Sequence, residues 1–351
     1  MKKIVLVLAV LLLSVSACKN PFLKKMLVEE EKGKTVSQVP KHTITFGVGS
    51  GLGTLKATVD GKEINSGDSV EQGKSVVFTA EPAPDYVVEQ WTNAGLAITE
   101  AGTDKTYTHS VTANADIKVK FDAPFIEGGA SLILSPDKLN IRVKARTADN
   151  SPIRIEGCTE TELISGAETV LHAQGTRVIL KGKITALGCD NNQLTALNVQ
   201  GLTALRWLDC YNNQLTALNV QGLTALQELF CYNNQLTALN VQGLTALKEL
   251  GCGDNQLTAL NVQGLTTLKY LLCCNNQLNA DAFKKLFDDL PVRADSDDAK
   301  CILYTEESGV TEGNHTDFTA PQDLKDAFDN AKIVKKWKMY KRDGSWPGVE
   351  L

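Results

Sequence analysis

The chain has 351 residues, 36 Lys and Arg against 41 Asp and Glu, a net charge of −5 and 43% hydrophobic residues. This length allows two or three domains with a substantial core, and the composition excludes wholesale disorder and a multi-spanning membrane protein. The acidic balance also argues against a nucleic-acid partner, because phosphate binding needs a clustered basic face.

The N-terminus has the order of a secretory signal peptide over residues 1–17. Lys2 and Lys3 precede ten apolar residues, 4–13, which reach only about 15 Å as a helix, half of a bilayer core. The segment Val15-Ser16-Ala17-Cys18 resembles a bacterial lipobox. This resemblance implies a lipid on Cys18 that anchors the chain in the cell envelope, at the outer membrane or cell surface. The alternative is an ordinary cleaved signal peptide in which Cys18 is incidental.

A charged segment with two prolines, residues 18–42, predicts a flexible tether. Period-2 alternation then predicts a small β-rich module over residues 43–123. Gly67-Asp68-Ser69-Val70-Glu71-Gln72-Gly73, and Ala83-Pro84-Asp85-Tyr86 followed by Trp91, resemble the divergent internalin B-repeat module of bacterial surface proteins. That resemblance implies a spacer or a weak adhesive unit. We expect strands at 43–46, 54–59, 75–79, 86–88, 107–111 and 117–121.

The glycine-rich segment at residues 49–53 invites comparison with a dinucleotide-binding fingerprint. It lacks the third glycine of that motif and the helix that should follow, so we expect a hairpin loop there.

An internal repeat of 21 residues dominates the second half of the chain, over residues 184–278. Read from Leu205, it fits the leucine-rich repeat template L-x-x-L-x-C-x-x-N-x-L, and it resembles the internalin J type, in which a cysteine takes one leucine position. The fold expected is mainly β: the module, then a leucine-rich repeat solenoid with a parallel sheet on its concave face and capping elements. The cysteine column is Cys189, Cys210, Cys231, Cys252 and Cys273, and the asparagine column is Asn192, Asn213, Asn234, Asn255 and Asn276.

The asparagine column is expected to be a structural ladder, because amides both donate and accept hydrogen bonds where the chain leaves each strand. For the cysteine column we favour buried free thiols. The four histidines are scattered, which argues against a metal site, and parallel Cβ vectors about 4.8 Å apart lie beyond the reach of a disulfide. Cys274 follows an inward-facing cysteine and should therefore point to solvent as a reactive thiol. Cys158 and Cys301 have no assigned role.

The columns that vary between repeats coincide with the outward positions of the repeat strand. In the four windows that begin at Cys189, Cys210, Cys231 and Cys252, 15 of 21 columns are identical, and three of the varied columns alternate around the strand. Exposed aromatic residues flanked by carboxylates are typical binding anchors. The alternative is that solvent-facing strand positions simply drift. The expected ligand-binding residues are Trp207, Asp209, Tyr211, Glu228, Phe230, Tyr232, Glu249 and Tyr270.

Caps are expected at both ends of the array, over residues 124–183 and 279–351. At the N-terminal end, strands at 131–134 and 176–180 are predicted, the second sealing the first coil. At the C-terminal end we expect a helix over 283–290, a strand at 301–304, a capping box at 319–322 opening a helix to 331, and a last strand at 333–340. The basic run 332–342 is interpreted as a solvated strand face rather than a docking surface.

The leading functional hypothesis is a lipid-anchored surface protein that binds a protein or glycan ligand on the concave face, without a metal or other cofactor. Adhesion is what the internalin resemblance implies. A structural envelope spacer without a ligand is the alternative. A thiol enzyme is the third hypothesis, with Cys274 as nucleophile, and it is disfavoured because the next histidine along the chain, His315, lies beyond a cap helix.

Overall fold

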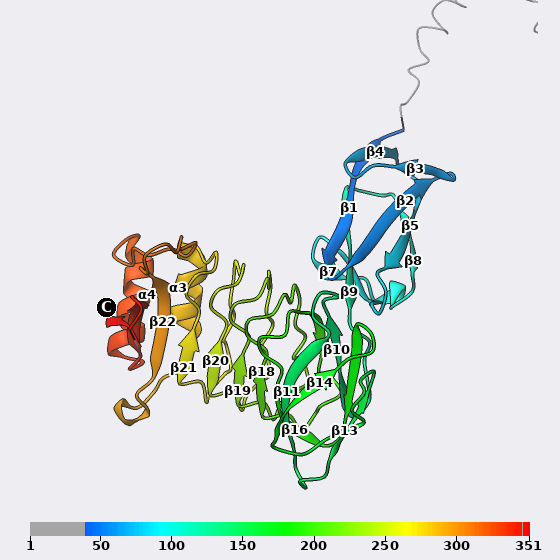
Figure 1. Ribbon diagram of the computed structural model, residues 1–351. Helices are drawn as coiled ribbons and strands as arrows, with labels where there is room; N and C mark the ends of the chain where they lie inside the picture. The colour runs from blue at the N-terminus through cyan, green and yellow to red at the C-terminus, as the bar shows by residue number, and fades with distance from the viewer. Residues whose placement is uncertain (1–38, 346) are drawn as a thin grey trace, which may run out of the picture.

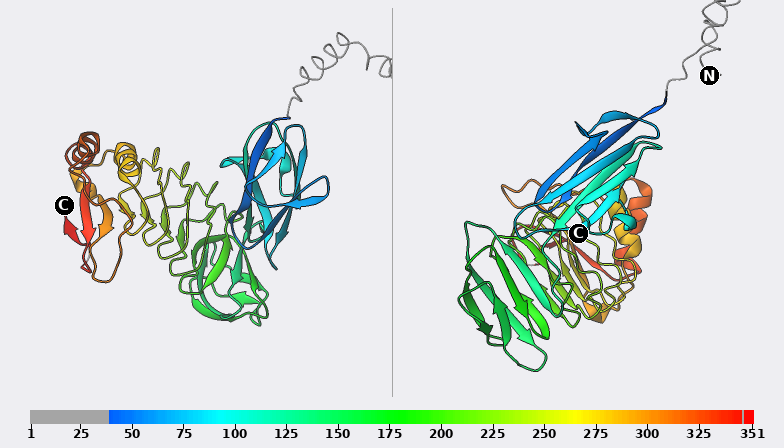
Figure 2. Two further views of the ribbon diagram at one scale, coloured as in Figure 1. Left: turned by 90° about the horizontal axis from the view of Figure 1, so that it is seen from above. Right: turned by 90° about the vertical axis from the view of Figure 1, so that its right-hand side faces the viewer.

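The computed structural model describes residues 39–345 and 347–351 and shows a mainly β chain (Figure 1). A β module and an N-terminal cap lie at one end of a row of repeats, and a cap with two α-helices closes the other end (Figure 2). The expected signal peptide (residues 1–17), the lipid site at Cys18 and nearly all of the expected tether fall outside the described residues. Within the described residues, no helix has both the length and the apolar character needed to cross a membrane.

The module consists of two sheets, with strand orders β4-β1-β9-β6-β7 and β3-β2-β5-β8. All six strands expected from the alternation are present, and β1 begins at Lys41, inside the expected tether. Val76, Phe78 and Ala80 alternate with more exposed residues along β5 and enter the module core. The elements are β1 (Lys41–Ser50), β2 (Gly53–Val59), β3 (Lys62–Ile64), β4 (Asp68–Glu71), β5 (Ser75–Pro82), β6 (Val87–Asn93), β7 (Leu96–Ala97), η1 (Thr99–Ala101), β8 (Thr106–Ser110) and β9 (Ala115–Asp122).

The N-terminal cap seals the first repeat with antiparallel strands. β11 pairs with β16, the first repeat strand, and β10 pairs with β17 of the same repeat. The expectation that residues 176–180 seal the first coil is wrong, because β15 pairs with β10 and β12 instead. The sealing strand β11 has alternating burial that the sequence analysis overlooked. The strands are β10 (Gly129–Leu134), β11 (Asn140–Thr147), β12 (Ile153–Glu156), β13 (Glu162–Leu163), β14 (Glu168–His172) and β15 (Arg177–Lys181).

Each successive repeat adds one short strand to a parallel ladder. β16, β18, β19, β20 and β21 pair in this order, and β22 and β23 of the C-terminal cap continue in the same direction. The register aligns equivalent leucines, such as Leu208, Leu229 and Leu250, and all three are fully buried. A single coil cannot cover its own leucines, so the stacking of coils supplies the core. The strands are β16 (Ile184–Gly188), β17 (Leu194–Asn198), β18 (Trp207–Asp209), β19 (Glu228–Phe230), β20 (Glu249–Gly251) and β21 (Tyr270–Leu272).

The asparagine column hydrogen-bonds each coil to the one before it. Asn234 accepts the N–H of Leu215 at 3.0 Å and donates to the carbonyls of Cys210 at 3.0 Å and Cys231 at 3.1 Å. Asn314 of the C-terminal cap takes the next position of the column, with the same kinds of hydrogen bond. Backbone groups that have no sheet partner at the end of each strand are therefore satisfied by side-chain amides. The repeat members of the column are Asn192, Asn213, Asn234, Asn255 and Asn276.

A second column of polar residues, immediately before the first, was missed from the sequence. These residues adopt the left-handed backbone region, which Asn and Asp enter more readily than other non-glycine residues. Their side chains bond along the column: Asn212 Nδ2 donates to Asn191 Oδ1 at 2.8 Å, and Asn275 Nδ2 donates to Asp254 Oδ1 at 2.8 Å. The backbone requirement explains the recurring doublet of Asn-Asn or Asp-Asn. The members are Asn191, Asn212, Asn233, Asp254 and Asn275.

The C-terminal cap packs two helices against the end of the array. Phe283, Leu286 and Phe287 are buried on the first helix, as their spacing predicts. The predicted capping box at 319–322 is wrong. The second helix has Pro321 at its N-cap without a side-chain hydrogen bond, and the hydroxyl of Thr319 donates to Asp317 instead. The predicted last strand also begins too early, since this helix extends to residue 333. The elements are α3 (Ala280–Asp289), η2 (Asp295–Asp297), β22 (Lys300–Thr305), α4 (Gln322–Ile333), β23 (Lys338–Arg342) and β24 (Val349–Glu350).

The β module is docked on the first repeats through both polar and apolar contacts. Asn198 donates to the carbonyl of Ala123 at 3.0 Å, and Thr216 accepts the N–H of Gly51 at 3.1 Å. Ala196 of the array joins the buried core of the module. The module is therefore joined to the array by a packed interface and not only by the chain.

Candidate functional site

The candidate site is the strand face, which we define as the three rows of outward side chains on and just after the repeat strands. Strand register aligns two of the rows, and backbone hydrogen bonds between successive coils align the third. All eight residues predicted to bind a ligand lie in these rows, and each is partly exposed. The rows are Trp207, Glu228, Glu249 and Tyr270; then Asp209, Phe230, Gly251 and Leu272; then Asp190, Tyr211, Tyr232, Gly253 and Cys274.

Gly251 in the second row, and Gly188 next to that row on β16, make room for aromatic rings. A Cβ atom on Gly251 would lie 2.9 Å from Cδ1 of Phe230, and one on Gly188 would lie 3.2 Å from the ring of Trp207. Tyr211 and Tyr232 stack with ring centroids 4.5 Å apart and planes 6° apart. The aromatic residues are thus held in fixed positions against the sheet, which lowers the ordering cost of any contact they make.

A cleft of about 840 Å³ opens between the strand face and the C-terminal cap. The repeats contribute Asp209, Phe230, Tyr232 and Glu249 to its walls, together with the neighbouring Lys269, Tyr270 and Leu272. This volume lies in the range of small-ligand sites, which combine apolar walls with a few polar groups. The cap completes the wall with residues that the sequence analysis did not connect to the site: Asp297, Asp298, Lys300, Arg342, Gly344 and Ser345.

Carboxylates on the strand face sit in a partly desolvated setting. Burial, reinforced by the nearby charge of Asp190, raises the pKa of Asp209 to about 7. Burial and the neighbouring Glu249 also raise the pKa of Glu228. Asp209 Oδ1 is buried and has no hydrogen-bond partner among the described residues. Such an acceptor is costly to leave unpaired.

The expectation that Cys274 points to solvent is wrong. The side chain lies on the strand face, as the alternation predicts, but it is fully buried in a small cluster with Leu272, Ile302 and Tyr340. Burial and the nearby Asp254 raise the pKa of its thiol well above the usual range. The cluster forms because the C-terminal cap covers this end of the face, and the alternation within a single repeat carries no information about that cover.

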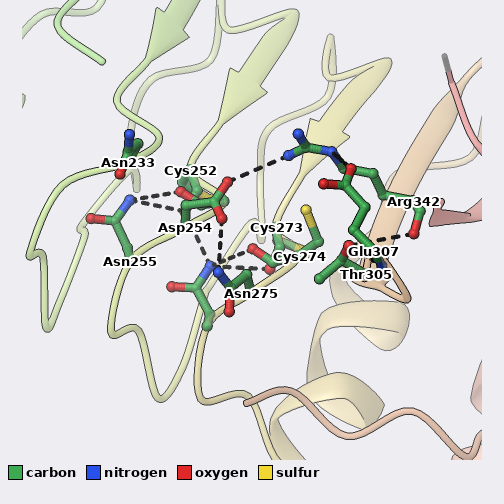
Figure 3. Close-up of polar contacts among 12 residues, drawn as sticks. Asn233, Cys252, Asp254, Asn255, Cys273, Cys274, Asn275, Thr305, Glu307 and Arg342 are labelled. Carbon is green, nitrogen blue, oxygen red and sulfur yellow. Dashed lines mark hydrogen bonds and ion pairs between the residues drawn. The ribbon is translucent and has the colours of Figure 1, made fainter. Parts of the chain in front are cut away.

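Arg342 is central to this cover (Figure 3). Its guanidinium lies 3.5 Å from Asp254 of the second polar column and 2.5 Å from Glu307 of the cap. Asp254 is the only acidic member of its column, in which the other repeats have asparagine. This substitution provides a counter-ion at the position where the array meets the cap.

The remaining described cysteines are also buried free thiols. Burial raises the pKa of Cys231 to about 12, and that of Cys158 to about 11. Cys301, unassigned from the sequence, lies on β22 beside the column and interacts with Cys273. Within residues 39–345 and 347–351, no group of three or more His, Cys, Asp or Glu side chains is arranged to hold a metal ion.

Comparison with known proteins identifies one part of the chain by sequence. Residues 53–124 match the family model of the divergent InlB B-repeat domain, which confirms the resemblance expected for the module. Among curated proteins there is no match to this chain. A solved structure described as the functional domain of InlJ from Listeria monocytogenes, including a cysteine ladder, is 21% identical, with a TM-score of 0.23. That likeness covers 48% of this chain and 46% of the other, so the chain spans less than half of its length.

Proposed function

We propose that this chain is a lipid-anchored bacterial surface protein that binds a protein or glycan ligand on the strand face. In this proposal the 21-residue repeats form a leucine-rich repeat solenoid, the strand face is its concave side, and Cys18 carries the lipid. The module match at residues 53–124 supports the coarser description of an internalin-like surface protein. Binding without catalysis is also part of the proposal.

The observation that carries the binding role is the preorganised cleft. Its aromatic walls come from three of the six columns that differ between the repeats, so side chains change where a ligand would touch, while the buried leucine and cysteine columns stay constant. Rigid aromatic anchors beside a few polar groups are typical of binding hot spots. The proposed absence of catalysis draws support from Cys274, whose covered and fully buried thiol is unsuited to attack a substrate.

The test removes the aromatic anchors while leaving the core intact. A variant with Trp207, Tyr211, Phe230 and Tyr232 replaced by alanine should bind host cells, extracellular matrix and glycan arrays at least about tenfold more weakly than the unchanged chain. The matched control replaces four exposed apolar residues elsewhere, and it should bind normally. Unchanged binding by the first variant, with its fold intact by circular dichroism, would favour the envelope-spacer alternative. The control residues are Leu96, Phe125, Ile164 and Ile333.

Anchoring and location have their own test. Cys18→Ala should abolish incorporation of radiolabelled palmitate and release the chain from the membrane fraction. Protease treatment of intact cells should degrade the wild-type chain if it faces outwards. Full protection from the protease would instead place the chain on the periplasmic side and contradict the surface assignment.

A further inference from the structure

Asp209 is the cleft-lining residue with a buried side-chain oxygen that has no hydrogen-bond partner among the described residues. It lies in the middle row of the strand face, between Gly188 and Phe230 in the strand register. Its Oδ1 atom is buried without a partner among the described residues, while the backbone N–H of Tyr211 hydrogen-bonds to the carboxylate. A partly buried carboxylate with an unpaired oxygen is unfavourable in the free protein and gains strongly from a donor.

Two acidic residues of the cleft, Asp209 and Glu249, have no cationic partner among the described residues. Lys300 of the cap is engaged by Asp298, and Arg342 is engaged by Glu307 and Asp254. Asp209 and Glu249 have no ion-pair partner within 4.0 Å among the described residues, and of the cleft-lining cations only Lys269 is likewise unpaired. When Asp209 is ionised, the array side of the cleft therefore has two unpaired carboxylates against one unpaired ammonium, an excess of negative charge that a bound cation would neutralise.

The walls beside Asp209 are aromatic. Phe230 follows it in the same row, and Tyr232, stacked on Tyr211, lines the same cleft. An aromatic face attracts a cation through its quadrupole, and the attraction grows when water is excluded. A carboxylate and aromatic rings together are complementary to an organic cation and less so to a neutral hydroxyl, which cannot neutralise the charge.

We infer that the cleft receives a cationic side chain, a guanidinium or an ammonium, from a protein partner, with the carboxylate of Asp209 as its acceptor and the rings of Phe230 and Tyr232 beside it. This inference rests on the proposed function, because it assigns the ligand class of the same face. The volume of about 840 Å³ exceeds what one side chain fills, so the partner contributes a short segment around the cation. Within the two ligand classes of the proposal, protein is favoured over glycan.

The test uses small probes and the purified chain with its methyl groups isotopically labelled for NMR. The probes are the capped tripeptide Gly-Arg-Gly, the same peptide with neutral citrulline in place of arginine, and maltotriose. Leu272 lines the cleft, so its methyl signals report binding there. The arginine peptide should bind at least about tenfold more tightly than the citrulline peptide. Asp209→Asn should remove that preference, whereas Asp137→Asn, an exposed site on the N-terminal cap, should preserve it.

Three results would overturn the inference: equal binding of the arginine and citrulline peptides, a preference that survives in Asp209→Asn, or binding of maltotriose alone. The last result would assign the cleft to glycans. Failure of the inference is distinguishable from failure of the proposed function. If Asp209→Asn binds cells normally while the four-alanine variant does not, only the cationic site is wrong. If the peptide preference depends on Asp209 but the four-alanine variant still binds cells, the cationic site stands and the cellular role is wrong.

Discussion

The buried carboxyl of Asp122 should make the stability of this protein depend on pH. Asp122 ends β9 at the interface with the array, is 3% exposed, and accepts the N–H of Ala123 at 2.7 Å. Burial, with a further contribution from the like charge of Glu89 on β6, raises the pKa of Asp122 from 3.8 to about 8. Lys120 lines the same small cavity but does not lie within 4.0 Å of the Asp122 carboxylate as an ion-pair partner.

The sign of the effect follows from proton binding. Between about pH 4 and pH 8 the folded chain holds a proton on Asp122 that the unfolded chain has lost, so the free energy of unfolding falls as the pH rises. At about 1.4 kcal/mol per pKa unit, the three pH units from 5 to 8 set a ceiling of about 4 kcal/mol. Asp122→Asn removes the titration and keeps an oxygen to accept the N–H of Ala123.

We therefore expect the advantage of Asp122→Asn over the unchanged chain to grow by about 3 kcal/mol between pH 5 and pH 8. Urea unfolding at both pH values measures it. Asp116→Asn is the matched control on the same strand. Hydrogen bonding from Thr45 lowers the pKa of Asp116, so this carboxyl is ionised in both the folded and the unfolded chain between pH 5 and pH 8. The difference in free energy of unfolding between Asp116→Asn and the unchanged chain should therefore stay constant over this range. An Asp122→Asn advantage that changes by less than about 1 kcal/mol would refute the reasoning.

Three further changes test the array, the strand face and the cap. Asn234→Ala leaves one N–H and three carbonyls without their amide partner, so the free energy of unfolding should fall by about 3 kcal/mol in urea titrations. Gly251→Val places side-chain atoms against the ring of Phe230; it should weaken ligand binding at least about tenfold in cell-binding assays while costing about 1–3 kcal/mol of stability. Arg342→Met removes the ion pair with Asp254 that joins the cap to the array, together with the pair with Glu307 inside the cap. It should speed native-state labelling of Cys274 by a thiol reagent, and an unchanged labelling rate would show that the pairs do not close the cover.

Sequence reasoning succeeded where one residue's environment repeats along the chain. The 21-residue period places Leu208 and Cys210 in the core and Trp207 on the opposite side, because a strand has only two faces. It failed where the environment depends on a distant segment. Cys274 obeys the alternation yet is buried by the cap. The cleft is walled in part by Arg342, and only the folded cap brings this residue into contact with the array. The second polar column, Asn191 and its equivalents, could have been found, since a recurring Asn or Asp at a turn signals a positive φ.

Asn314 gives the C-terminal cap a hydrogen-bonding position equivalent to that of a repeat. Through Asn314 the cap docks on hydrogen-bonding groups that every repeat offers, and an interior 21-residue unit could be gained or lost without altering either boundary of the array, provided that Asp254 stays beside Arg342. Each such change would move the cap by one strand spacing, about 4.8 Å. Because Asp209 and the cap share a cleft, a change in copy number would bring a different row of side chains opposite the cap. The fold would thus permit the ligand site to be rebuilt by duplication or deletion alone, without point substitution.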